Sequence, residues 1–396
     1  MTGAGVSGRT TQEAPASPKP DLRIETVSSE AEFERLAGSW DELVHAMRRP
    51  SPFLLHGWLL EWWRHYGGEN DLTVHVAYRG DRLVGALPLC LRRRRGLRVS
   101  EFVGGTGAAL ADLLVAPGEE VSAVSPLVEH AVSSGHDFVN LFGLPGSSRL
   151  VEALPPNALR LVERLEAPVL DLSAGWDAVY DARMSSNARG HRRRRRRQLE
   201  ALGTVETSVA RTREELEPAL EDAFRVYALR WRGRREVSGF VSPTGMRFHR
   251  AALLRLAELD VPRLVTIRLD GRAIAFASSL QVSSQGYGLT TAFDPEFARY
   301  SPGWEAILLR LETAAGEGIS RFEFLGAAMP HKQKLTDRLE PIYQGIGLPR
   351  TLRGRAAVEA LVGGIRIRRA IKRSSTARKV YYRVRRLAAI NARSEP

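Results

Sequence analysis

The chain has 396 residues, 43% of them hydrophobic, which is enough for two ordinary domains that each bury a core. Its formal net charge is +13, but residues 351–396 hold thirteen Arg or Lys and two Glu, so +11 of that charge belongs to the C-terminal tail. The net charge of +2 on the other 350 residues is too small to indicate that they bind nucleic acid.

Composition disfavours several other classes of protein. No apolar run reaches the length of a membrane span, and no signal segment opens the chain. The single cysteine, Cys90, excludes an intramolecular disulfide, and the nine histidines lack ligand spacing, so no metal site is predicted. We therefore expect a cytoplasmic location. Residues 1–20, rich in Thr, Gly, Ser, Ala and Pro, are predicted to form a disordered leader.

The first predicted elements are a helix over 33–47 and an aromatic-rich stretch that follows it. This stretch, PFLLHGWLLEWWRHYG, contains Phe53, Trp58, Trp62 and Trp63. Large aromatic side chains of this kind are expected in a core or between two lobes. The alternative is that they form the wall of a substrate groove.

An internal repeat then becomes visible. TVHVAYRGDRLVGALPLCL and RLVTIRLDGRAIAFASSLQV both predict a hairpin with a glycine in its turn. Each hairpin leads to a helix and then to a similar strand, HDFVNLFGLP in the first half and SRFEFLGAAMP in the second. The shared order predicts a duplicated α+β unit, with the boundary in the Pro-containing stretch 155–168. The predicted divisions are 1–20, 21–160, 161–350 and 351–396.

The second unit opens with a helix that contains six successive arginines, Arg192–Arg197. Ser186 or Asn187 is expected to cap this helix, which should end near Gly203. At 100° per residue six side chains surround the helix, so one or two of them must face the protein or a ligand. The interpretations left open are a solvated helix whose arginine stems cover apolar surface, phosphate recognition, and docking onto anionic lipid or RNA.

The segment 286–334 carries the strongest functional signal. It predicts a strand over 287–293, a loop that ends in Ser-Pro-Gly, a helix over 304–316 and a strand over 321–325. A helix that begins after such a loop has first-turn N–H groups without partners and a dipole that favours negative charge. The segment therefore predicts an anion site at the helix start.

At these residues the chain resembles the GNAT acyltransferase superfamily, and more closely its two-lobed FemAB-like and CelD-like (BioF2-type) branch. The matching motifs are Tyr300-Ser301-Pro302-Gly303, Phe322-Glu323-Phe324-Leu325-Gly326 and the lysine that follows, Lys332. The resemblance implies an α+β fold of tandem GNAT-like lobes, each with a mostly antiparallel central sheet flanked by helices, followed by a basic tail. It also implies acyl-CoA, acetyl-CoA above all, as co-substrate, and an amine acceptor on a sugar, a sugar nucleotide or a lipid-linked envelope or polysaccharide precursor.

The chain departs from the family pattern at two places. Ser-Pro-Gly stands where the superfamily has a Gly-rich loop opened by Gln or Arg, and His331 stands where the branch often has an aromatic residue. The Ser-Pro-Gly loop is equally compatible with a plain helix start.

Acyl transfer to an amine needs an anchored donor, a polarised carbonyl, a base and an acid. Polarisation in this superfamily comes from a bulged, splayed strand, which corresponds to 289–292 here. Glu323 is the candidate base and Tyr300 the candidate acid. The candidate donor-binding residues are Ser301, Gly303, Trp304 and Glu305. The candidate substrate-binding residues are Lys332, where the family keeps a lysine, and the Arg230-Trp231 pair, which is also compatible with a tryptophan in the core and an arginine beside it.

The tail contains Val380, Val384 and Leu387 at helical spacing among arginines, which predicts a basic amphipathic helix able to lie on anionic lipid. A disordered extension or a helix packed on the body is the alternative. Two rival functions stay open. One is a FemAB-like peptidyltransferase that takes aminoacyl-tRNA, and the other is a non-catalytic, membrane-peripheral factor of polysaccharide biosynthesis.

Overall fold

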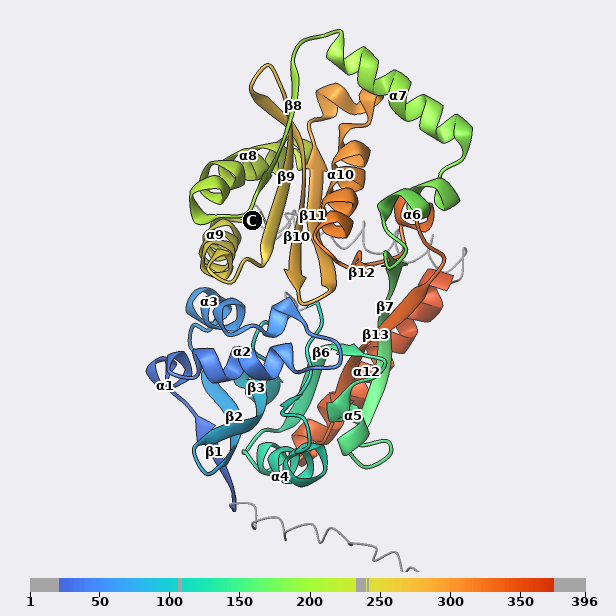
Figure 1. The fold of residues 1–396 in the computed structure, drawn as a ribbon. Coiled ribbons are helices and arrows are strands. Elements are labelled where there is room, and N and C mark those ends of the chain that lie inside the picture. Colours follow the sequence, from blue (N-terminus) through green and yellow to red (C-terminus); the bar gives the residue numbers. More distant parts are fainter. Residues whose placement is uncertain (1–20, 106–108, 233–239, 241, 374–396) are drawn as a thin grey trace, which may run out of the picture.

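The computed structural model describes residues 21–105, 109–232, 240 and 242–373, which form two lobes joined by one continuous sheet (Figure 1). The 13 strands follow the order β1-β2-β3-β4-β6-β13-β7-β12-β11-β10-β9-β8, with β5 paired to β3 outside this path. The pairs β4–β6 and β11–β12 are parallel and the other pairs are antiparallel. The predicted mixed architecture, a mostly antiparallel sheet flanked by helices, is confirmed.

The first lobe contains the N-terminal strands and helices. Its strands are β1 (Leu22–Val27), β2 (Asp71–Arg79), β3 (Arg82–Arg94), β4 (Leu97–Phe102), β5 (Leu114–Val115) and β6 (Phe138–Pro145). Its helices are α1 (Glu30–Glu34), α2 (Ala37–His45), η1 (Pro52–Leu54), α3 (His56–Tyr66), α4 (Glu120–Val132) and α5 (Arg149–Ala153).

The second lobe repeats the order of hairpin, helix and strand. Its strands are β8 (Val205–Ala210), β9 (Pro262–Leu269), β10 (Arg272–Val282), β11 (Gln285–Phe293) and β12 (Arg321–Glu323). Its helices are α6 (Trp176–Arg183), α7 (Ser186–Glu200), α8 (Arg213–Trp231), α9 (Pro243–Ala257), η3 (Pro295–Tyr300), α10 (Pro302–Gly316) and α11 (Pro330–Gln333). Both predicted hairpins, β2–β3 and β9–β10, are present.

Two strands tie the lobes together. β7 (Leu159–Asp171) crosses the predicted boundary, so that its last three residues pair with β12 while the rest pairs with β13 (Leu339–Gly347). β13 comes from the end of the second lobe, yet it also pairs with β6 of the first. Because strands from both lobes pair with one another, backbone hydrogen bonds as well as side-chain contacts fix the relative position of the lobes.

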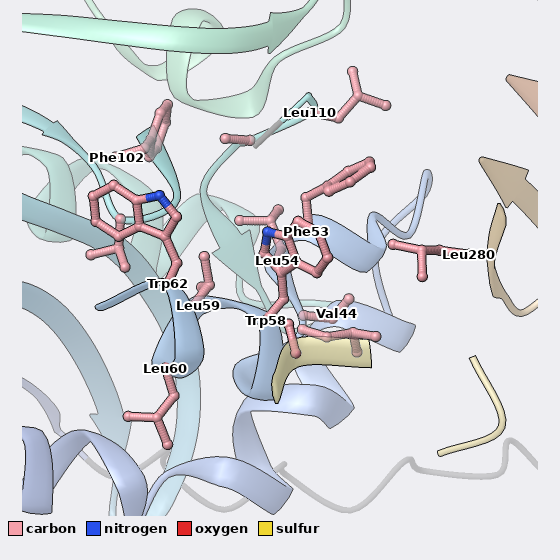
Figure 2. Close-up of a cluster of buried hydrophobic side chains, with 14 of the residues drawn as sticks. Val44, Phe53, Leu54, Trp58, Leu59, Leu60, Trp62, Phe102, Leu110 and Leu280 are labelled. Carbon is pink, nitrogen blue, oxygen red and sulfur yellow. The ribbon is translucent and has the colours of Figure 1, made fainter. Parts of the chain in front are cut away.

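Aromatic side chains pack at the junction of the lobes. Phe53 and Trp58 are 1% exposed and Trp62 is 6% exposed, and Figure 2 shows them within a cluster of buried apolar side chains. Trp58 meets Phe248 of α9 edge to face at 5.0 Å between ring centroids. The aromatics of this stretch are therefore core and interlobe packing, as the first of the two interpretations predicted.

The arginine-rich helix lies across the end of the second lobe, above α10 (Figure 1). Its cap is Ser185, whose side chain accepts a hydrogen bond from the Ala188 amide, so the predicted cap at Ser186 or Asn187 was wrong by one or two residues. The chain leaves the helix at Ala201, close to the predicted end.

A long basic helix, α12 (Leu352–Arg373), follows β13 and packs Val358 and Val362 against the first lobe. The predicted leader and the amphipathic segment around Val380 to Leu387 lie outside the described residues. Within the described part of the chain, no helix combines the length and the apolar character that a membrane crossing needs.

Candidate active site

The second lobe has a bulge in β11, within the segment 289–292 that the family resemblance implied. Ser278 of β10 pairs with Thr290, whereas the next residue, Ser279, pairs with Gly288, so Leu289 has no partner on β10. On its other side β11 pairs with β12 only over Gln285–Tyr287. We call the opening between β11 and β12 beyond Tyr287 the wedge. Strands that part at a bulge leave backbone groups free to face a ligand.

A pocket of about 640 Å³ lies at the start of α10 and is roofed by α7. Four of the predicted site residues line it: Tyr300, Ser301, Trp304 and Glu305. Half of the other lining residues are of basic types: Arg183, His191, Arg192, Arg195, Arg196, His331 and Lys334. Glu305 is the one carboxylate on the described lining of this pocket. Such a charge balance suits an anionic ligand.

The amides predicted to bind phosphate are used inside the helix. Both Trp304 N–H and Glu305 N–H donate to the Ser301 carbonyl oxygen, at 3.0 and 3.2 Å. Ser301 itself adopts a left-handed conformation with φ at 56°. An anion at this helix start would therefore be held chiefly by side chains and by the helix dipole.

The arginine-rich helix is anchored to this helix start by one ion pair. The Arg192 guanidinium donates to both oxygens of Glu305 at 2.7 Å, and Arg196 lies 3.7 Å from the same carboxylate. Arg193, Arg194, Arg195 and Arg197 are exposed. The six arginines therefore divide between a structural contact and an exposed, positive face beside the pocket.

Glu323 lies outside the pocket, in a buried ion pair between the lobes. Its side chain is 0% exposed and accepts hydrogen bonds from the Arg49 guanidinium through both oxygens, one of them at 2.6 Å. Arg321 adds a further contact at 3.3 Å. A substrate amine reaches this carboxylate only if the ion pair opens, so the geometry weighs against the predicted role as base.

Gly303 and Arg230 both contact Phe293, at the end of β11. A Cβ on Gly303 would lie 2.6 Å from Phe293 Cδ1, so this glycine allows α10 to pack closely on the strand. The Arg230 guanidinium lies 4.7 Å from the centre of the Phe293 ring and 5.6 Å from that of Trp231. Neither Arg230 nor Trp231 lines the pocket at the helix start.

Lys332 lies at the edge of the wedge. Its ammonium donates to the carbonyl oxygens of Leu325, of Phe324 at 3.3 Å and of Ala327 at 3.4 Å, which follow β12. Burial, together with the charge of Arg310, lowers the pKa of Lys332 to about 8. The pKa of the neighbouring His331 is also lowered, by burial and by the charges of Lys332, Arg310 and Lys334, so this imidazole is neutral at pH 7.

Arg310, on the side of α10 that faces the sheet, was not among the predicted site residues. It is 4% exposed, and its Nη1 donates to the Ser278 carbonyl oxygen at 3.1 Å and to Thr291 Oγ1 at 3.4 Å. The helical spacing contained the signal, because Arg310 follows buried Ile307 by three residues and precedes Ala314 by four.

The equivalent helix start in the first lobe is closed by the chain itself. Glu119, at the start of α4, accepts hydrogen bonds from Arg79 at 2.8 Å and from Ser122 Oγ at 2.5 Å, so a carboxylate of the chain itself lies at this helix start. The segment before it lies between β3 and β6, where the Ala111 amide donates to the Gly143 carbonyl oxygen and β5 pairs with β3.

A second cavity, of about 410 Å³, lies between the lobes. Its lining includes Arg49, Asp112, Arg321 and Glu340. Arg321 borders this cavity, whereas the next residue, Phe322, packs among the side chains of α10, so the cavity lies on the face of β12 opposite to α10.

Comparisons with known proteins agree with this architecture. Residues 186–333 match the family model described as an acetyltransferase (GNAT) domain. A comparison with curated proteins found no match. Among solved structures, FemX is similar with a TM-score of 0.57 and 11% identity, over 81% of this chain and 96% of that one. The C-terminal domain of an Agrobacterium fabrum protein described as a lysylphosphatidylglycerol synthetase has a TM-score of 0.52 and 13% identity, over 84% and 95%.

The family match covers the bulge, the wedge, most of the pocket at the start of α10 and Lys332, and the similar structures extend over both lobes. Residues 186–333 thus match the acetyltransferase (GNAT) domain family, and the two-lobed fold is similar to that of FemX.

Proposed function

We propose that the protein transfers an acyl group from an acyl-CoA thioester to an amine, with the second lobe as the active lobe. The observation that carries this proposal is the bulge at Leu289 beside the opened wedge, next to a basic pocket at the start of α10. The pocket is suited to the phosphates of the donor, and the bulge exposes backbone next to the position of a thioester carbonyl. The first lobe is its degenerate copy, since a carboxylate, that of Glu119, lies at the corresponding helix start.

In the transfer, the amine nitrogen attacks the thioester carbon, the C–N bond forms and the C–S bond breaks. The amine proton passes to a base, and the leaving thiolate takes a proton from an acid. Glu323 and His331 are the two candidate bases, and His331 has the advantage that it directly precedes Lys332, at the edge of the wedge, and is neutral. Tyr300, at the start of α10, is the candidate acid.

For the acceptor we propose an amine on a sugar, a sugar nucleotide or a lipid-linked envelope precursor. The fold it shares with FemX and with a domain described as a lysylphosphatidylglycerol synthetase supports an envelope role. The interlobe cavity, with Arg49 and Arg321 on its lining, is the candidate acceptor site because it lies on the face of β12 opposite to α10. Lys332 and the Arg230-Trp231 pair remain candidate substrate contacts.

Aminoacyl-tRNA is a second candidate donor, favoured by the exposed arginines of α7 beside the pocket. Calorimetric titration of the full chain with acetyl-CoA, with charged tRNA and with anionic vesicles distinguishes the proposed function from its two alternatives. Binding of acetyl-CoA followed by amine-dependent release of free thiol supports the proposal. Absence of binding to any acyl-CoA contradicts it, and saturable binding of charged tRNA alone would favour the second donor. Binding to vesicles alone would favour a non-catalytic, membrane-peripheral factor in the cytoplasm.

A further inference from the structure

Arg310 is a buried cation with no charged partner in the described structure. Its hydrogen bonds run through Nη1, to Ser278 and Thr291, and its Nε is buried without a partner. Burial lowers the pKa of Arg310 to about 10, and no carboxylate opposes that effect. Arginines as buried as this are ordinarily paired, because an isolated charge in a protein interior is costly. Within the described residues, the charge of Arg310 is therefore met by two neutral acceptors and the Phe322 ring alone.

Part of the role of Arg310 is structural. The bulge interrupts the ladder between β10 and β11, and the guanidinium supplies a donor to the Ser278 carbonyl oxygen at that interruption. The absence of a side chain at Gly288 makes room for it, since a Cβ there would lie 3.2 Å from both Nη atoms. A neutral amide donor would serve this purpose without the cost of a buried charge, so bracing the bulge does not explain the charge.

A second cation, Lys332 of α11, lies at the end of β12. Its ammonium donates to the Phe324 carbonyl oxygen at 3.3 Å, and the Arg310 guanidinium lies 5.0 Å from the centre of the Phe322 ring, two residues earlier. Both cations therefore lie beside the end of β12, and the Arg310 charge contributes to the lowered pKa of Lys332. Within the described residues no carboxylate pairs with Lys332 either. Two like charges brought together in a partly dry site are stabilised when an anion lies between them.

The position along α10 distinguishes this site from the pocket at the helix start. Arg310 lies eight residues after Pro302, which corresponds to about 12 Å along the helix. One phosphate group cannot contact both places. An extended donor whose phosphates occupy the pocket would instead bring its acyl end toward the wedge.

We propose that Arg310 and Lys332 form a subsite for a carboxylate group carried by one of the reacting substrates. This inference rests on the proposed function, which places the reacting groups in the wedge. The unused Nε–Nη2 edge of Arg310 presents two parallel N–H donors, the arrangement that binds a carboxylate in bidentate fashion, and Lys332 adds a point charge. The carboxylate belongs either to a dicarboxylic acyl donor, such as a succinyl thioester, or to an amino-acid acceptor.

Calorimetric titration of the full chain at pH 7 tests this subsite on the donor side. We expect succinyl-CoA to bind with a Kd about tenfold lower than that of acetyl-CoA, the size of one charge-assisted hydrogen bond. R310M should make the two Kd values equal, and R310K, which keeps the charge, should retain part of the difference. K332M leaves the contact between Arg310 and the bulge intact and should also reduce the difference between the two Kd values. This variant therefore tests the subsite even if R310M does not fold.

The acceptor side is tested by titrating the acetyl-CoA complex with glycine and with glycinamide. Tighter binding of glycine that disappears in R310M places the carboxylate on the acceptor. If neither comparison shows a preference for the carboxylate that depends on Arg310, the proposal is overturned and Arg310 only braces the bulge. If no CoA thioester binds, the proposed donor is wrong, and titrations with succinate and with succinamide test the subsite separately. A preference for succinate that depends on Arg310 supports the subsite, and equal binding of the two compounds overturns it.

Discussion

Arg49 of the first lobe holds the carboxylate of Glu323 in the second, and this carboxylate is 0% exposed. We expect E323Q to lower the free energy of unfolding by about 3 kcal/mol, because it leaves the half-buried Arg49 charge with Glu340 alone, 3.3 Å away. Turnover of the folded variant should change less than about threefold, well short of the effect of removing a base. Urea denaturation and steady-state acyl transfer measure the two quantities.

R49M is the matched control for this pair. The two single variants should be destabilised to a similar extent, and the double variant by less than their sum, since the residues interact directly. A stable E323Q protein with turnover reduced about a hundredfold or more would instead establish Glu323 as the base.

Arg195 lines the donor pocket and Arg193, two residues earlier on the same helix, does not. We expect R195Q to raise the Kd for acetyl-CoA about tenfold and to weaken its dependence on salt, because one charge-assisted contact to phosphate is lost. R193Q should leave both unchanged. Equal effects of the two substitutions on the Kd would mean that the total positive charge of α7 attracts the donor and that Arg195 makes no specific contact with it.

Lys332 makes the stability of the fold depend on pH in the alkaline range. Its pKa is lowered from 10.5 to about 8, so between these values the unfolded chain binds a proton that the folded chain does not. Stability from this group is therefore present above pH 10.5 and is lost as the pH falls through 8. Relative to K332M, the wild type should gain up to about 3 kcal/mol between pH 7 and pH 10.5. Denaturation curves at several pH values measure this gain. The control is K334M, which removes the exposed Lys334 and should leave the pH dependence of stability unchanged. If the stability of K332M changes with pH in parallel with that of the wild type, Lys332 titrates normally.

Gly303 and Gly316 lie at opposite ends of α10 and differ in their surroundings. A Cβ at Gly303 would meet the Phe293 ring at 2.6 Å, whereas a Cβ at Gly316 would meet nothing within 4 Å. We expect G303A to cost about 1–3 kcal/mol in the free energy of unfolding and G316A to be neutral or stabilising by up to about 1 kcal/mol. If G303A is as stable as G316A, close packing on Phe293 is not what requires glycine at 303.

The sequence predicted the elements around the site well because their patterns are local. Hairpin turns, apolar spacing along α10 and the Ser-Pro-Gly loop each depend on residues close together in the chain. Four of the predicted residues, Tyr300, Ser301, Trp304 and Glu305, accordingly line one pocket.

What the sequence left open depends on contacts across long stretches of chain. Alternation in FEFLG placed Glu323 on the face away from Phe322, correctly, but only the fold shows that Arg49 lies there, 274 residues earlier. The Pro-containing stretch at 155–168 looked like a boundary, yet much of it forms β7, which pairs with β13 from the far end of the second lobe. The helical spacing places Arg310 on the buried face of α10, but its contact with the Ser278 carbonyl oxygen lies at the bulge between β10 and β11, which the spacing does not reveal.

The location of the donor site can be measured directly by hydrogen exchange on the full chain, with and without saturating acetyl-CoA. We expect slower exchange at the start of α10 and in 288–293 of β11, with no change around Glu119 at the start of α4. Protection at the start of α4 without protection at α10, or no binding and no protection at all, would contradict it.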